Sequence, residues 1–183
     1  EITSADQNPR TIISWSNSGG NQYFQIRSWS HFIYFETWSD SGYSSRSAFV
    51  PGGDGAHHIA IVKTAASTNN MLLYVDGVLS GSDKTVGSFT GLDEVNIGVL
   101  RRFNSYSNYY MGELDEIRVW NYDRCLEEIL AQKDCELTGN EAGLELYYNF
   151  NQGTAAGDNT GETALDDISS NGKGGTFNNF TLD

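Results

Sequence analysis

The sequence predicts an all-β fold, an antiparallel β-sandwich of two sheets. Short segments rich in β-branched and aromatic residues recur along the chain and are separated by Gly, Ser and Asn turns, which is typical of antiparallel sheets. The chain contains 20 Gly and only 2 Pro, and 13% of its residues are aromatic. This composition suits a β-fold with many turns. At 183 residues we predict one domain spanning 1–183, large enough for a core of its own.

The strands follow from alternation and from the turn residues between them. In chain order, the predicted strands and extended stretches are 11–15, 23–27, 31–38, 46–50, 57–63, 72–75, 78–80, 94–100, 110–122, 144–150 and 175–182. Asp76-Gly77 predicts a tight hairpin, because both residue types tolerate positive φ. Residues 39–45, 101–109 and 151–171 are expected to be loops.

One helix is predicted, near 125–133. Residues 126–133 carry Glu127 and Glu128 early and Lys133 late, as the helix dipole prefers. Cys125 and Cys135 flank this segment, and if the protein is secreted a local disulfide is the favoured interpretation. Such a bridge would stabilise the fold by ~2–3 kcal/mol on the loop-entropy account. With no His pair nearby, the two cysteines make a poor zinc site.

The charge balance limits the partners of this chain. Eleven Lys and Arg stand against 24 Asp and Glu, for a net charge of −13. Such a surface repels phosphates and anionic lipids, so neither nucleic acid nor membrane insertion is expected. No apolar run is long enough to span a membrane, and no signal peptide is present. Because the chain starts at Glu1 without Met, we expect a mature or excised fragment.

The stretch 110–122, YMGELDEIRVWNY, mixes strand alternation with an almost continuous apolar run. Its core, GELDEIRVWN, resembles the closing strand of laminin-G-like domains in the concanavalin-A-like lectin/glucanase superfamily. Two upstream segments match in the same order, HHIAIV at 57–62 and LLYVDGV at 72–78. The resemblance covers roughly 10–130 and implies a two-sheet jelly roll in a secreted or cell-surface protein.

The C-terminal segment is unusual for such a domain. Segments like 144–150, 166–172 and 175–176 usually open a laminin-G-like domain, whereas here they come last. Either 144–183 folds back to complete the sandwich or it begins a following repeat. Folding back is favoured because Tyr147 and Tyr148 should not be left in solvent. The segment after Cys135 also resembles linkers in multi-module bacterial secreted proteins.

Catalysis is not expected, although glucanases share the fold. Enzymes of the superfamily place three acids on one strand, and Glu113-Leu114-Asp115 matches only the first half of that pattern. Ile117 or Arg118 occupies the position of the third acid, and neither can act as one. His57-His58 is also a poor metal pair, because adjacent strand residues point to opposite faces.

Calcium is expected as a structural brace, with a structural hydrogen-bonding role for Asp115 as an equal alternative. Asp115 stands in an apolar strand, where a carboxylate needs a partner. It resembles the family's acidic position at the sheet edge. Calcium prefers several oxygen ligands, which the C-terminal loop can supply. The predicted side-chain ligands are Asp115, Asp166, Asp167 and Asn171.

The predicted function is that of a non-catalytic carbohydrate-binding module in a larger secreted protein. Sugars stack their C–H faces on aromatic rings and need directed polar partners for their hydroxyls. Arg101 and Arg102 form a local basic spot that suits an acidic or sulfated polysaccharide. The predicted ligand-binding residues are Trp29, Trp38, Tyr43, Arg101, Arg102, Asn104, Tyr106 and Tyr109. Alternatively, the aromatic residues cap the core and the chain is a protein–protein adhesion domain or, less favoured, a glycoside hydrolase.

Overall fold

A computed structural model of the chain describes residues 8–17, 19, 22–39, 42–50, 55–65, 71–80, 91–154 and 156–178. Within it the chain forms two compact units, Glu1–Glu113 and Leu114–Asp183. The predicted single domain over 1–183 stays a prediction.

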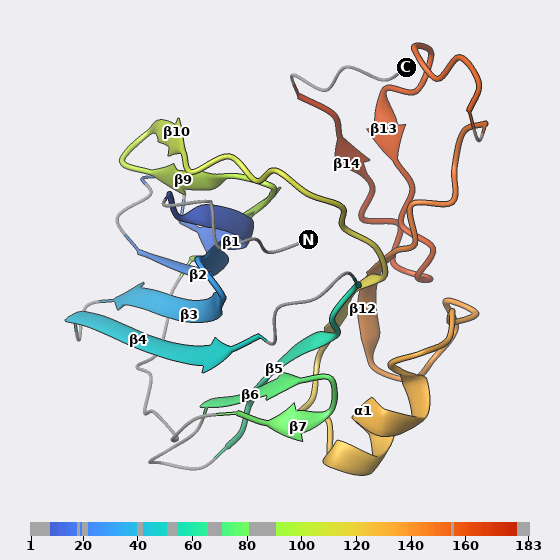
Figure 1. The fold of residues 1–183 in the computed structure, drawn as a ribbon. Helices are drawn as coiled ribbons and strands as arrows, with labels where there is room; N and C mark the ends of the chain where they lie inside the picture. Colours follow the sequence, from blue (N-terminus) through green and yellow to red (C-terminus); the bar gives the residue numbers. More distant parts are fainter. Residues whose placement is uncertain are drawn as a thin grey trace. The chain divides into compact units, whose positions relative to one another are not determined.

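The larger sheet of the first unit has five antiparallel strands (Figure 1). From one edge to the other they are β4 (Gly42–Phe49), β3 (Phe32–Ser39), β2 (Tyr23–Trp29), β1 (Arg10–Ser16) and β8 (Glu94–Ile97). All five were expected from the sequence. The boundary of β4 was wrong, since the strand begins at Gly42, where a loop was predicted. Paired with β3 over its whole length, β4 takes its register from that neighbour.

The second sheet of this unit consists of three antiparallel strands, β5 (Ile59–Lys63), β6 (Met71–Val75) and β7 (Val78–Leu79). The tight turn predicted between the last two is confirmed, with Asp76 and Gly77 at φ of 53° and 79°. The Asp76 side chain also holds the chain that leads into β5. It accepts a hydrogen bond from His58 N (2.9 Å), and His57 Nδ1 lies 2.8 Å from its other oxygen. The two histidines therefore have a structural contact here.

The core of the first unit lies between these two sheets. Ile33 and Ala48 of the five-stranded sheet pack with Leu73 and Val75 of β6, and Val50 closes the cluster. Phe35 and Met71 form a second buried pair across the same gap. Apolar side chains from both sheets thus bury one another, as in a β-sandwich. This confirms the fold class.

A short hairpin replaces most of the loop predicted over 101–109. It is built from β9 (Leu100–Arg102) and β10 (Ser105–Ser107), and Figure 1 shows it beside β1. Phe103 and Asn104 form its turn at φ of 49° and 59°, so that the chain reverses after two residues. Hydrogen bonds from Thr11 N to Asn108 O (2.8 Å) and from Ser14 Oγ to Val99 O (2.8 Å) join the hairpin to β1.

In the second unit, β11 (Ile117–Trp120) pairs antiparallel with β12 (Leu144–Tyr148). The strand predicted over 110–122 is therefore much shorter than expected. Glu116 has φ of 54°, outside the range of a strand, and Asp115 Oδ1 accepts a hydrogen bond from Glu116 N (2.9 Å). Asp115 consequently lies before the strand and is exposed.

The predicted helix is confirmed as α1 (Leu126–Gln132). Glu128 reaches back from the first turn and accepts a hydrogen bond from Cys125 N at 2.9 Å. Among the residues that the structure describes, α1 is too short and too polar to span a bilayer.

The predicted disulfide is not formed. Cys125 and Cys135 are both free thiols and both exposed. They lie beyond opposite ends of α1, whose seven residues span about 10 Å at 1.5 Å each. A disulfide requires Cα atoms about 4.4–6.8 Å apart, so a bridge would need the last turn of the helix to unwind.

The C-terminal part of the second unit adds a small hairpin, β13 (Ala164–Leu165) and β14 (Gly175–Thr176). The former lies within the predicted loop, and the latter is shorter than the predicted stretch 175–182, whose last residues lie outside the described ones. Tyr147 and Tyr148 are buried, as expected. Whether 144–183 completes the sandwich or begins a repeat stays a prediction.

Candidate functional site

The five-stranded sheet has a second face, turned away from the three-stranded sheet, which we call the outer face. Strand alternation assigns side chains to it. In β2, Phe24 and Ile26 pack toward the core. The alternate residues, and the residues opposite them on β3, therefore belong to the outer face. The opposed pairs are Tyr23 with Trp38, Gln25 with Glu36, Arg27 with Tyr34, and Trp29 with Phe32.

A hydrogen-bonded polar band crosses the middle of the outer face. Arg27 donates through Nε and Nη2 to both oxygens of Glu36, at 2.8 and 2.6 Å. Gln25 Nε2 and Tyr43 OH donate to the same carboxylate, at 2.8 and 2.6 Å. Thr11 Oγ1 in turn donates to Gln25 Oε1 (2.9 Å). With the Glu36 side chain only 6% exposed, these bonds make the band rigid.

The pKa of Glu36 follows from this arrangement. Burial by itself would raise it, but the hydrogen bonds from Arg27, Tyr43 and Gln25 and the positive charge of Arg27 outweigh burial. The pKa of Glu36 is therefore lowered. Glu36 is an ionised, fully bonded carboxylate at neutral pH.

One end of the outer face carries the Arg102 cluster, which consists of Arg102, Tyr23, Trp38, Tyr43 and Phe103. The guanidinium carbon of Arg102 lies 5.6, 5.4 and 5.0 Å from the ring centres of Tyr23, Trp38 and Phe103. Trp38 and Tyr43 are 6.2 Å apart and tilted by 49°. Three of the four rings are open to solvent, Trp38 at 37%, Tyr43 at 54% and Phe103 at 59%.

The opposite end carries the Trp29 cluster, made of Trp29, Phe32, Tyr34 and Phe49. Phe32 and Phe49 meet edge to face at 5.5 Å, and Tyr34 lies 6.0 Å from Trp29. Arg27 stacks over Tyr34 at 4.2 Å, which links this cluster to the polar band. Tyr23 and Trp29 are six residues apart on one strand, so the two ends are separated by about 20 Å.

The structure divides the predicted binding residues. It brings Trp38, Tyr43 and Arg102 together and places Trp29 at the other end of the face. Arg101 instead forms an ion pair with Glu94 and donates to Asn104 Oδ1 (3.2 Å). Tyr106 and Tyr109 are exposed; the first stands opposite Arg101 in the hairpin register, and the carbonyl of the second accepts a hydrogen bond from Arg10.

Three residues of the outer face, Gln25, Arg27 and Glu36, were not predicted. Their signal was present in the sequence as alternation. YFQIRSW places Gln25 and Arg27 on the face opposite Phe24 and Ile26. Aromatic residues precede and follow these two polar residues on the same face.

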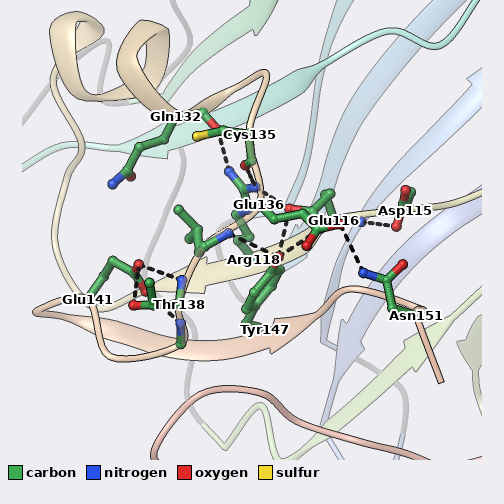
Figure 2. A network of polar contacts seen from close by, with 12 residues as sticks. Asp115, Glu116, Arg118, Gln132, Cys135, Glu136, Thr138, Glu141, Tyr147 and Asn151 are labelled. Atoms are coloured by element: carbon green, nitrogen blue, oxygen red, sulfur yellow. Dashed lines mark hydrogen bonds and ion pairs between the residues drawn. The ribbon is translucent and has the colours of Figure 1, made fainter.

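The second unit contains a polar network of another kind (Figure 2). Arg118 donates to the carbonyl oxygens of Gln132 (2.6 Å) and Cys135 and forms an ion pair with Glu116. Tyr147 OH donates to Glu116 at 2.8 Å and accepts from Leu137 N at 3.2 Å. The network ties the end of α1 to β11 and β12. Its role is structural.

The predicted calcium ligands all lie in the second unit, but they do not form one group. Within the described part of the chain, no three His, Cys, Asp or Glu side chains lie close enough to hold a metal, and this includes Asp115, Asp166 and Asp167. Asp167 accepts from Tyr147 N, Ser169 N, Ser169 Oγ and Lys173 N at 2.7–2.9 Å. Burial would raise its pKa, but these bonds lower it.

Asn171 is occupied as well, since its Nδ2 donates to the carbonyl oxygens of Leu144 and Glu145. Asp167 and Asn171 thus tie the C-terminal loop to β12. These side chains do not fit a shared calcium site.

The comparisons with known proteins agree with the sandwich. A laminin G family model, described as the concanavalin A-like lectin/glucanases superfamily, matches residues 1–130. The chain belongs to this superfamily. The family-model match confirms the resemblance found in the sequence. No curated protein matches the chain.

Two solved structures resemble the chain. One is a proposed carbohydrate-binding protein from Bacteroides ovatus, with a TM-score of 0.68 and 18% identity over 99% of this chain and 50% of that one. The other is the CBM40 module of the Ruminococcus gnavus IT-sialidase bound to α2,3-sialyllactose, with a TM-score of 0.59 and 16% identity over 72% of this chain and 78% of that one. At these identities the likeness establishes the fold. The chain spans half the length of the B. ovatus protein.

Proposed function

We propose that this chain is a non-catalytic carbohydrate-binding module that binds a polysaccharide along the outer face of its five-stranded sheet. The observation that carries the proposal is the arrangement of that face, with solvent-exposed aromatic rings at both ends and a buried, hydrogen-bonded polar band between them. A superfamily that includes lectins, and similarity in fold to two proteins described as binding carbohydrate, support it.

The physical fit is to a sugar chain. Exposed rings such as Trp38 and Tyr43 offer flat apolar surfaces for the C–H faces of pyranose rings. The intervening band carries Ser45 and Ser47 of β4 on the same face, opposite Glu36 and Tyr34. Their hydroxyls can both donate to and accept from sugar hydroxyls. A ligand that bridges both ends must be an oligosaccharide chain, because about 20 Å separates them.

The absence of catalysis is part of the proposal. A glycoside hydrolase needs one carboxylic acid with a raised pKa to protonate the leaving oxygen. On the outer face, Glu36 has a lowered pKa and is bonded to Arg27, and Glu94 is paired with Arg101. Neither carboxylate is available as that acid.

We further propose that the module belongs to a larger secreted or cell-surface protein, where neighbouring modules add avidity.

A glycan array tests the proposed function. The parent protein should bind a defined set of glycans, and Trp38→Ala should lose binding at least about tenfold, because a stacking ring contributes ~1 kcal/mol or more beyond the area it buries. Tyr122→Ala is the matched control, since Tyr122 is an exposed ring of the second unit. If the parent binds no glycan, the proposed function is wrong and the adhesion alternative is favoured. If the parent binds a glycan and both variants bind it equally well, the outer face is not the binding site.

Structural calcium remains a separate proposal, with ligands other than the predicted set. Backbone carbonyl oxygens would have to supply most of the coordination, because Asp167 and Asn171 are already bonded. A metal that binds only the folded state raises its stability. We therefore expect a higher melting temperature in millimolar calcium than in chelator. Equal melting temperatures would refute the proposal.

A further inference from the structure

Arg27, Arg101 and Arg102 contact side chains of the outer face, and within the described part of the chain Arg102 differs from the other two in lacking an acidic partner. Arg27 makes two hydrogen bonds to Glu36, and Arg101 is paired with Glu94. Arg102 has no carboxylate partner among the described residues, and its guanidinium group stacks on three aromatic rings of the Arg102 cluster. Its Nε is buried and makes no hydrogen bond.

We propose that Arg102 is the subsite for the anionic group of an acidic sugar, a carboxylate or a sulfate, and that Arg101 takes no part in binding. This inference rests on the proposed carbohydrate-binding function and assigns the ligand class to one residue of the predicted basic pair.

The position of Arg102 prepares its guanidinium group for an anion. Rings on several sides limit its rotamers, so little conformational entropy is lost on binding. Stacking on rings satisfies the flat faces of the group but uses none of its five N–H donors. A planar carboxylate can accept two of those donors at once, and a sulfate presents a similar pair of oxygens.

The negative net charge of the protein makes Arg102 more important for attracting an anionic glycan. With a net charge of −13, the protein repels anionic glycans over most of its surface. On the outer face, the charges of Arg27 and Arg101 are balanced by their partners, whereas no described residue balances that of Arg102. An acidic glycan would therefore be attracted to this end, where Trp38 and Tyr43 can stack against its sugar rings.

The two arginines are adjacent on β9 but contact different groups of the outer face. Arg101 forms an ion pair with Glu94 of β8. Arg102 instead stacks on Tyr23 of β2 and Trp38 of β3. Arg101→Ala is thus a matched control, because it makes the same charge change one residue away.

The test compares three matched pairs of glycans, each containing an acidic member and its neutral counterpart. The pairs are polygalacturonate with its methyl ester, 3′-sialyllactose with lactose, and dextran sulfate with dextran. Binding is measured by calorimetry for the parent protein, Arg102→Ala, Arg101→Ala and Arg102→Lys. The first two pairs report on carboxylates and the third on sulfates.

We expect the parent to prefer the acidic member of at least one pair. Arg102→Ala should weaken that binding at least about tenfold, the effect of losing hydrogen bonds between charged groups. The affinity of Arg102→Ala for the acidic glycan should also depend less on salt concentration than the affinity of the parent does. Arg101→Ala should bind within about twofold of the parent, and Arg102→Lys should fall between the two. Circular dichroism and the melting temperature establish that each variant is folded.

Two results would overturn the assignment. In the first, the parent prefers the neutral members and Arg102→Ala binds them equally well, which leaves the carbohydrate-binding function intact but removes the anionic subsite. In the second, Arg101→Ala weakens acidic binding as much as Arg102→Ala does. Failure of the parent to bind any glycan on the array would instead refute the proposed function itself.

Discussion

Arg102 in the first unit and Arg124 in the second both stack on aromatic rings, yet their surroundings differ. Arg124 lies 3.8 Å over Trp120, and it also donates to Glu128 O at 3.0 Å and to Gln132 Oε1 at 2.6 Å. It is further paired with the Glu128 carboxylate at 3.5 Å. Arg102 stacks on three rings and has no polar partner in the described part of the chain.

The difference distinguishes an arginine that holds the fold from one that is available to a ligand. A stacked guanidinium whose donors are used by backbone and side-chain oxygens fastens a helix to a strand. A stacked guanidinium with unused donors keeps its hydrogen-bonding capacity for a molecule from outside. Arg118 belongs to the first kind, because its donors reach Gln132, Cys135 and Glu116 (Figure 2).

The largest effect on stability is expected from Arg118→Ala. The change leaves Glu116 without its charge partner and removes the bonds to two carbonyl oxygens at the end of α1. We expect a loss of about 3 kcal/mol in the free energy of unfolding, as for other broken, largely buried ion pairs. Urea denaturation followed by circular dichroism measures it. A loss under about 1 kcal/mol would show that the network is not structural.

Glu36→Gln is expected to have the next largest effect on stability. The amide keeps the shape of Glu36 but leaves the largely buried charge of Arg27 uncompensated, at a cost of about 2 kcal/mol. Glycan binding should weaken too, because the polar band loses its rigidity. Unfolding and calorimetry on the same variant check both effects. Parent-like stability would mean that the Arg27–Glu36 pair contributes nothing.

Acid should reproduce part of that loss in the parent protein. The pKa of Glu36 is lower in the folded state than its ordinary value of 4.5. The resulting stability is present above pH 4.5 and is lost as the pH falls through the folded-state pKa. Melting temperatures measured from pH 7 down to pH 3 should fall more for the parent than for Glu36→Gln. Parallel curves would exclude Glu36 as the source.

Arg124→Ala is expected to lower the free energy of unfolding by about 1 kcal/mol. This is less than for Arg118→Ala, because the ion pair between Arg124 and Glu128 is partly exposed. Binding to any acidic glycan should be unchanged. A melting curve and one calorimetric titration are sufficient. Weakened glycan binding would break the distinction between the two stacked arginines.

Arg102→Ala should have the smallest effect on stability, within about 0.5 kcal/mol of the parent, although it is expected to have a large effect on acidic-glycan binding. Its removal breaks no hydrogen bond or ion pair with another described residue, and its cation–π contacts are partly exposed. Urea denaturation would measure the change. A loss comparable to that of Arg118→Ala would make Arg102 a structural residue.

Local patterns were sufficient to predict most of the secondary structure. Alternation predicted the strands of both sheets of the first unit, Asp76-Gly77 predicted their tight turn, and the charges of 126–133 predicted α1. These features depend on residues close in sequence, whose side-chain periodicity and φ preferences are local properties. The family followed from three short segments in a fixed order.

The pairings between distant residues were decided only by the tertiary structure. Arg101 and Arg102 are alike in the sequence, and only the pairing of one with Glu94 and the stacking of the other on Trp38 separates them. The sequence favoured a bridge between Cys125 and Cys135, but in the structure α1 separates the two residues and both are free thiols. Charge pairing and cross-linking depend on distances between side chains, and strand pairing sets those distances over tens of residues, beyond the reach of local sequence patterns.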